Sequence, residues 1–254
     1  MRLRRSWLPV VLAAAAFLPL ASAQPQSQAV YTFIADWQVP RAQWAAFTEA
    51  AMKNTVPVLE RLVADGTLIE FAITASVVHL EEGPTHTFWW AADGFADLQR
   101  ALGELLKVTQ FQSAEFSNAK HRDRLLRSVI YESPQKTKLS SGFGHLSVNQ
   151  IQPGKAQQWR SLFDKYTKPV YDKLLADGVI LGYGVDQEWI HTEAPGARYT
   201  WYLAPNAEAV DKVNAATAAA QRQSGPAVGQ AFGEVMVPGS HRDSLDRILY
   251  YVHK

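Results

Sequence analysis

The sequence predicts an α+β protein made of two tandem βαββαβ units. Three observations lead to this class: an internal duplication, helix-period segments that alternate with β-rich runs, and polar turns between them. The 254 residues are 47% hydrophobic and include no cysteine, which excludes disordered and disulfide-stapled classes. We predict a signal peptide over 1–23, a first unit over 28–133, a linker over 134–141 and a second unit over 142–253.

The first 23 residues have the pattern of a cleaved secretory signal. Three arginines within the first five residues precede an apolar run over 8–20, and Ala21-Ser-Ala supplies a small-residue cleavage site. A transmembrane helix is the alternative, but the run is shorter than the roughly 20 residues of a span and contains two prolines. We expect a periplasmic or secreted protein with no integral membrane segment after cleavage.

Charge argues against a polyanionic partner. The chain has 25 basic and 24 acidic residues, and three arginines leave with the signal peptide, so 22 basic residues remain. A nearly balanced charge gives no general attraction to phosphate backbones, so we expect no nucleic-acid partner.

The duplication appears in two blocks. The segment 55–92 aligns without gaps to 167–204, with 11 of 38 residues identical. A second block, 121–127, recurs as 241–247, so the second unit carries eight additional residues before it. Two repeated blocks in the same order indicate a duplicated domain.

Each unit is predicted to contain strand, helix, strand, strand, helix and strand. In the first unit these cover 31–35, 40–64, 67–79, 85–92, 96–111 and 128–131. In the second unit they cover 144–148, 153–176, 179–191, 198–203, 206–220 and 247–252. Pro57 and Pro169 predict a kink at the same point of the first helix of each unit. The Gly/Pro-rich stretch 224–239 is predicted to be a surface excursion or lid.

A βαββαβ unit whose first helix ends in Ala-Asp-Gly, followed by a third strand that carries Trp89 or Trp201, resembles the dimeric α+β barrel superfamily of ferredoxin-like domains. This superfamily includes antibiotic-biosynthesis monooxygenases and, as tandem copies, the chlorite dismutases. The resemblance covers nearly the whole mature chain. It implies that two antiparallel sheets face each other as an intramolecular α+β barrel, either as a monomer (an internal pseudo-dimer) or as a homodimer of it.

The two copies differ where a ligand site is expected. His145 stands where the first unit has Phe33, and the alternating residues of 183–191 are more polar and aromatic than those of 71–79. Aromatic walls with a few polar groups are typical of small-molecule sites, although aromatics can also simply fill a barrel. The predicted ligand-binding residues are His145, Tyr183, Gln187, Trp189 and Trp201.

The repeated His-Arg-Asp blocks form a possible second site. His121, Arg122, His241 and Arg242 could move protons or hold an anion. The alternative, which we favour, is structural: Asp123 and Asp243 cap the backbone ahead of the last strand of each unit.

Other chemistries are excluded or unsupported. His79 with Glu81, and His191 with Glu193, offer only two ligands each, so no metal site is predicted. Without cysteine there are no thiol nucleophiles, and no Gly-x-Ser-x-Gly, phosphate-loop or His-Glu-x-x-His motif occurs. No histidine lies in a motif that matches a haem ligand of the chlorite dismutases.

Three functions remain open. The first is an extracytoplasmic protein that binds a small apolar or aromatic molecule in the barrel. The second, implied by the resemblance, is a cofactor-independent monooxygenase-like or haem-dependent barrel enzyme. The third is a structural or interaction protein whose barrel is filled. The sequence decides neither enzymatic activity nor the cofactor.

Overall fold

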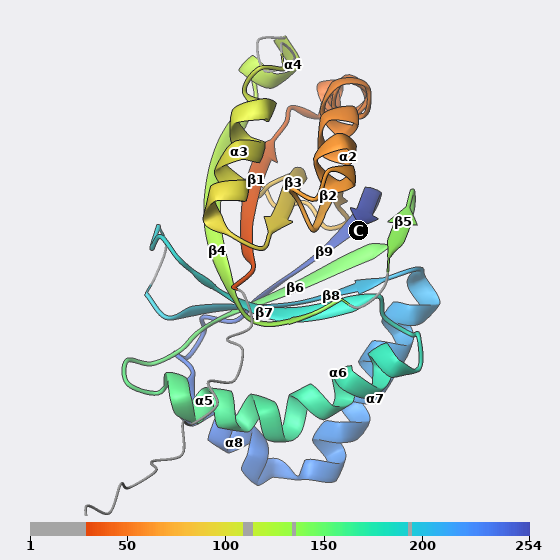
Figure 1. Ribbon diagram of the computed structural model, residues 1–254. Helices are drawn as coiled ribbons and strands as arrows, with labels where there is room; N and C mark the ends of the chain where they lie inside the picture. Colours follow the sequence, from red (N-terminus) through yellow and green to blue (C-terminus); the bar gives the residue numbers. More distant parts are fainter. Residues whose placement is uncertain (1–28, 109–113, 134–135, 193–194) are drawn as a thin grey trace, which may run out of the picture.

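The chain folds into a closed antiparallel β-barrel with helices on its outside (Figure 1). The computed structural model describes residues 29–108, 114–133, 136–192 and 195–254, so the predicted signal peptide lies outside the described residues. The eight barrel strands follow the order β2-β3-β1-β4-β7-β8-β6-β9, and β9 pairs with β2 to close the ring. No helix in the described part of the chain is long and apolar enough to cross a membrane.

The barrel consists of two four-stranded halves. The first half contains β1 (Tyr31–Gln38), β2 (Glu70–Ser76), β3 (His86–Ala92) and β4 (Lys120–Glu132). The second half contains β6 (Phe143–Gln150), β7 (Gly182–Glu188), β8 (Ala197–Ala204) and β9 (Arg242–His253), and the short strand β5 (Thr137–Leu139) pairs with the end of β9. The predicted α+β class and the barrel are confirmed, and matched strands occupy matched places in the two halves.

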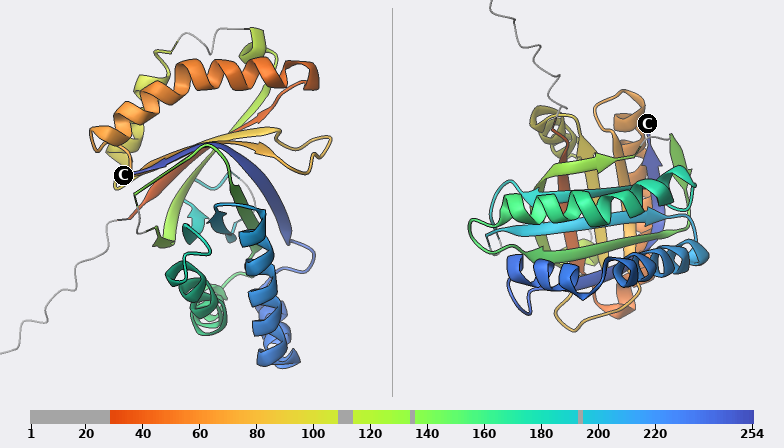
Figure 2. Two further views of the ribbon diagram at one scale, coloured as in Figure 1. Left: turned by 90° about the vertical axis from the view of Figure 1, so that its right-hand side faces the viewer. Right: turned by 90° about the horizontal axis from the view of Figure 1, so that it is seen from below.

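Helices cover the outside of each half, as the two views of Figure 2 show. Over the first half lie η1 (Arg41–Gln43), α1 (Trp44–Ala50), η2 (Ala51–Thr55), α2 (Val56–Ala64), α3 (Phe95–Leu105) and α4 (Ala114–Ser117). Over the second half lie α5 (Ala156–Leu162), η4 (Phe163–Thr167), α6 (Lys168–Ala176), α7 (Ala207–Ser224) and α8 (Pro226–Val235).

The predicted kinks at the two prolines are π-helical turns. Pro57 and Pro169 lie in the first turn of α2 and α6, and the π-helical segments η2 and η4 precede them directly. Proline cannot donate the helical hydrogen bond and its ring crowds the preceding turn, so a locally wider helix accommodates it without a break.

Two sequence predictions need correction. The last strand of each half begins earlier than predicted, so the His-Arg-Asp blocks lie within β4 and around the start of β9 rather than ahead of the strands. Charged residues can occupy β4 because Arg122 and Arg124, two residues apart, both pair with Asp36 on the neighbouring strand β1. The stretch 224–239 lies at the surface as predicted, but most of it forms the helix α8, which is anchored by the fully buried Val235.

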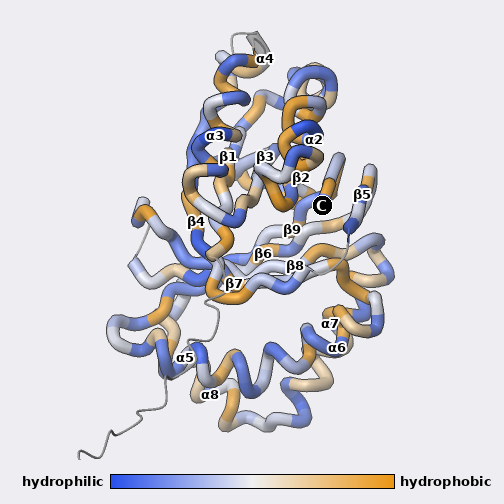
Figure 3. The backbone as a smooth tube through the Cα atoms, viewed as in Figure 1, coloured by the Kyte–Doolittle hydropathy of each residue, from blue (hydrophilic) through white to orange (hydrophobic). Residues whose placement is uncertain are grey.

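The hydrophobic core is divided between the two faces of the sheet. One cluster packs between each half of the barrel and its own helices, and two smaller clusters lie among the inward-facing residues of the strands. Hydrophobic residues therefore recur along both strands and helices, as Figure 3 shows. Because both faces of the strands are covered, the barrel interior is shielded from solvent along most of its length.

Candidate functional site

The barrel is not filled by its own side chains. Strand alternation directs Thr32, Ile34 and Asp36 of β1 inward, and the inward side chains of the other strands leave a cavity of about 120 Å³. Ser244, an exposed residue of β9, also lines this cavity, so the cavity lies close to solvent at this end of the barrel.

Two tryptophans at matched positions form apolar walls of the cavity. Trp89 lies on β3 and Trp201 on β8. The indole N–H of Trp201 donates a hydrogen bond to Asp186 Oδ2 at 2.9 Å. The ring passes so close to β7 that a Cβ at Gly184 would lie 2.6 Å from two ring atoms. Glycine at this position is therefore what allows the indole to lie against the barrel wall.

Carboxylates from four strands also line the cavity: Asp36, Glu70, Asp186 and Asp246. Glu70 is 1% exposed and accepts a hydrogen bond from the Tyr251 hydroxyl at 2.6 Å. Asp186 accepts one from the Ser128 hydroxyl, also at 2.6 Å. Neutral donors thus satisfy the lone pairs of these two groups without balancing their charge.

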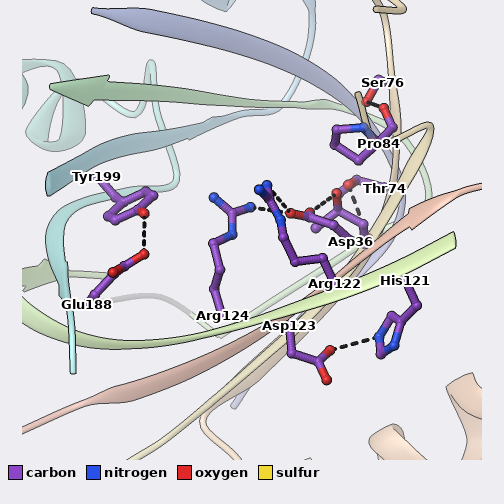
Figure 4. Close-up of polar contacts among 11 residues, drawn as sticks. Asp36, Thr74, Ser76, Pro84, His121, Arg122, Asp123, Arg124, Glu188 and Tyr199 are labelled. Atoms are coloured by element: carbon purple, nitrogen blue, oxygen red, sulfur yellow. Dashed lines mark hydrogen bonds and ion pairs between the residues drawn. The ribbon is translucent and has the colours of Figure 1, made fainter. Parts of the chain in front are cut away.

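Asp36 is the carboxylate with a cationic partner (Figure 4). Arg124 Nη2 lies 2.6 Å from Asp36 Oδ2, and the Thr87 hydroxyl donates to Asp36 Oδ1 at 2.9 Å. The Arg124 guanidinium also lies 5.5 Å from the centroid of the Tyr199 ring, whose hydroxyl donates to Glu188 at 2.9 Å. This network joins β1 and β4 of the first half to β7 and β8 of the second across the barrel interior.

Burial changes the acidity of the other three carboxyl groups. Desolvation raises the pKa of Glu70 to about 7 and the pKa values of Asp186 and Asp246 to about 6. The hydrogen bonds that these groups accept oppose the rise but do not cancel it. The cavity therefore contains carboxyl groups that can gain or lose a proton near neutral pH.

His145 is among the residues that border the cavity, although its ring lies on the helix-facing side of β6. Its ring stacks on Tyr202 with centroids 4.9 Å apart and an interplanar angle of 14°. Phe33 and Trp90 make the same stack in the first half, at 4.8 Å and 16°, against the helix-facing core. Burial lowers the pKa of His145, and the nearby Asp243 opposes this change.

The other predicted ligand-binding residues are divided between the two faces. Tyr183 faces the helices, and its hydroxyl donates a hydrogen bond to Asp172. Gln187 lies four residues further along β7 and therefore faces the same side. Trp189 is 37% exposed and packs against Phe95 with ring centroids 4.6 Å apart. Trp201 faces the cavity. Of the five residues, His145 and Trp201 border the cavity, whereas Tyr183, Gln187 and Trp189 do not.

The residues of the possible second site make local contacts. His121 lies 2.7 Å from Asp123 and stacks on Trp37, and Arg122 reaches Asp36 at 3.5 Å. In the second half, His241 lies 2.9 Å from the Asp243 carboxylate and 3.1 Å from the side-chain oxygen of Asn149. Arg242 donates to the Gly239 carbonyl at 2.7 Å.

Sequence reasoning missed the carboxylates of the cavity. The signal was present, because Asp36 interrupts an apolar strand and Asp186 follows Val185 in a short β-rich run. The sequence prediction combined Trp201, which faces the cavity, with Tyr183 and Gln187, which face the helices.

The described residues contain no group of three or more His, Cys, Asp or Glu arranged to hold a metal ion. A haem does not fit the barrel cavity either. Even drug-sized ligands occupy pockets of roughly 300–1,000 Å³, and the imidazole of His145, the histidine beside the cavity, stacks on the helix-facing side. The proposed function therefore involves no haem.

The fold has clear counterparts among solved structures, although no family model and no curated protein matches the sequence. A proposed monooxygenase from Fusobacterium nucleatum aligns with a TM-score of 0.61 at 6% identity, covering 90% of this chain and 96% of the other. A proposed monooxygenase from Lactobacillus acidophilus aligns at 0.57 and 9% identity, covering 88% and 96%. A proposed chlorite dismutase aligns at 0.53 and 12%, covering 87% and 95%. These neighbours are dimeric α+β barrel proteins, and this chain shares their fold.

Proposed function

We propose that this chain is an extracytoplasmic protein that binds one compact small molecule inside its barrel, between Trp89 and Trp201. The observation that carries the proposal is the cavity of about 120 Å³ with these two indole walls and a few polar groups. Aromatic walls with a small number of placed polar groups are the usual composition of small-molecule sites. An engineered cavity of roughly 150 Å³ holds benzene, so the ligand has about that size.

The polar lining refines the sequence-based expectation of an apolar or aromatic ligand. Thr32, Glu70 and Asp186 line the cavity. Their hydroxyl and carboxyl groups can make hydrogen bonds to a polar group of the ligand. The ligand we propose therefore combines an apolar body with at least one polar group.

Filling the cavity tests the proposal. Gly144 lines the cavity on β6, and a Cβ there would meet only Leu203, at an ordinary 3.6 Å. Gly144→Val should fold, because valine favours strands, and should abolish binding of benzene-sized ligands measured by calorimetry. Ser147→Val, on the helix-facing side of the same strand, is the matched control and should bind normally. Equal binding by both variants would refute the proposal.

One observation favours enzymatic activity as a second candidate. Glu70, Asp186 and Asp246 have pKa values raised to between about 6 and 7 inside a cavity, which suits general acid–base catalysis near neutral pH. A monooxygenase-like reaction would use O2 to replace two hydrogen atoms on one carbon of the ligand by one oxygen atom, and the second oxygen atom would leave as water. Mass spectrometry of ligand recovered after incubation distinguishes turnover from binding.

The location and assembly of the chain belong to the same proposal. The amino-terminal pattern supports export and cleavage after Ala23, so protein purified from a periplasmic fraction should begin at Gln24 by mass spectrometry. The barrel is already closed within one chain, which supports a monomer that native mass spectrometry can detect.

We also infer that the halves 28–133 and 142–253, joined by 134–141, descend from one duplicated unit. The equal strand order, the matched prolines and the matched tryptophans support this origin. Residues 142–253 expressed alone should pair their open edges and form a dimer, and a stable monomer would argue against it.

A further inference from the structure

The charges that face the cavity are unbalanced. Four carboxylates line it, from β1, β2, β7 and β9. Among the described lining residues, Arg124 of β4 is the only basic side chain apart from His145, whose ring lies on the helix-facing side. Arg124 is paired with Asp36 at 2.6 Å, and these side chains are 10% and 5% exposed. One guanidinium therefore balances one carboxylate and leaves Glu70, Asp186 and Asp246.

The partners of these three groups are mainly neutral. Tyr251 donates to Glu70, and both Ser128 and the Trp201 indole donate to Asp186. Asp246 lies opposite Ser76 in the strand pairing, and Arg124 acts on it only as a minor electrostatic influence. A buried carboxylate with neutral donors alone is costly when ionised, and a cation placed beside it recovers much of that cost.

The rest of the lining suits a cation with an apolar body. The indoles of Trp89 and Trp201 can attract a cation to their faces as well as cover apolar carbons. The hydroxyl of Thr32, which lines the cavity, can accept a hydrogen bond from an ammonium N–H. An anion would instead meet three unbalanced carboxylates.

We propose that the ligand of the barrel cavity is a small organic cation: a primary ammonium group on an apolar body of about benzene size. This inference rests on the proposed function, since it names the ligand class of the same cavity. The ammonium lies nearest Asp186 and Glu70, and the apolar body lies between the two indoles.

Three probes carry the same ring and differ in the charge of their polar group: cyclopentylamine, cyclopentanol and cyclopentanecarboxylate. The amine and the alcohol also match in size, whereas the carboxylate is larger. Each is titrated by calorimetry into the mature full-length chain at about pH 8, where the carboxylates are ionised and the amine is protonated. We expect the amine to bind at least tenfold more tightly than the alcohol, and the carboxylate not to bind. Gly144→Val should abolish amine binding.

Variants then identify the groups that bind the ammonium. Asp186→Asn should weaken amine binding at least tenfold while leaving cyclopentanol binding unchanged. Asp243→Asn, on the helix-facing side of β9, is the control and should bind the amine normally. Should Asp186→Asn fail to fold, Glu70→Gln makes the same test, with the same expected loss.

The outcomes distinguish a failure of the proposed small-molecule site from a failure of the proposed ligand class. If none of the probes binds, both the proposed function and this inference fail. If the alcohol or the carboxylate binds as tightly as the amine, the cavity is a ligand site but its ligand is not a cation, and only this inference is overturned. Amine binding that persists in Gly144→Val lies outside the cavity and overturns the inference too.

Discussion

Glu70 is buried without a basic partner, so replacing it by glutamine should stabilise the protein at high pH and leave it little changed at low pH. The Tyr251 hydroxyl, which donates to Glu70 at 2.6 Å, can donate equally to the amide oxygen of glutamine. The variant therefore keeps the shape and the hydrogen bond of the native side chain and removes only its ability to ionise.

The magnitude follows from proton linkage. Burial raises the pKa of Glu70 from an ordinary 4.5 to about 7, so the folded state binds a proton more tightly than the unfolded state. The stabilisation by this protonated group is complete below about pH 4.5 and is lost as the pH rises through 7. At 1.36 kcal/mol for each pKa unit, the loss is roughly 3 kcal/mol, and Glu70→Gln avoids it.

Urea unfolding of both proteins between about pH 4.5 and 8 measures this difference. The free energy of unfolding of Glu70→Gln should exceed that of the native protein by roughly 3 kcal/mol at pH 8, and the gap should shrink toward zero at pH 4.5. Asp186 and Asp246 add pH dependence of the same sign to both proteins, so the difference isolates Glu70. Exposed Glu49→Gln is the control, with no change expected. A gap that does not depend on pH would refute the reasoning.

Four further substitutions test the barrel interior, its two faces and a covering helix. Gly184→Ala should lower the free energy of unfolding in urea by about 1–3 kcal/mol, because its Cβ would meet the indole of Trp201 at 2.6 Å. Its control, Gly103→Ala, has open space on helix α3 and should raise the free energy of unfolding by up to about 1 kcal/mol. Asp36→Asn leaves the buried Arg124 guanidinium without its carboxylate and should cost about 3 kcal/mol by thermal unfolding; a cost below 1 kcal/mol would show that the pair contributes little. His145→Phe should leave ligand binding in the cavity unchanged, because this ring stacks on the helix-facing side, and loss of binding by calorimetry would contradict that assignment.

The architecture could be predicted from the sequence because its signals are local or repeated. The repeated sequence blocks, the matched prolines and the tryptophan-bearing third strands were each visible in the sequence, and the resemblance to dimeric α+β barrel proteins implied the barrel. The two long terminal strands were missed in part because alternating charges at 120–124 are typical of turns when their partner strand is unknown. The pairing of β4 with β1 explains these charges, because it places the arginines beside Asp36. Strand register depends on residues that are far apart in the sequence.

The site was harder to predict for a specific physical reason. Strand alternation shows that Tyr183, Val185 and Gln187 share one face and that Gly184 and Asp186 share the other, but both faces of a barrel strand are covered. The usual rule that the apolar face is the buried one then cannot decide which face lines the interior. The predicted residues therefore came from both faces: Trp201 lies inside beside Asp186, whereas Tyr183 and Gln187 face the helices.

Closure of the ring by β2 and β9 makes the order of synthesis matter for folding. Tyr251 and Glu70 are 181 positions apart, yet their contact lies at the seam where these two strands meet. While the chain emerges, β2 has an unpaired edge until β9 has been made, and such nonlocal pairing is slow. During this interval the exposed edge can pair with other chains and favour aggregation. A truncation that removes β9 would therefore leave the edges of β2 and β6 open and the barrel unable to close, however well the first half had folded.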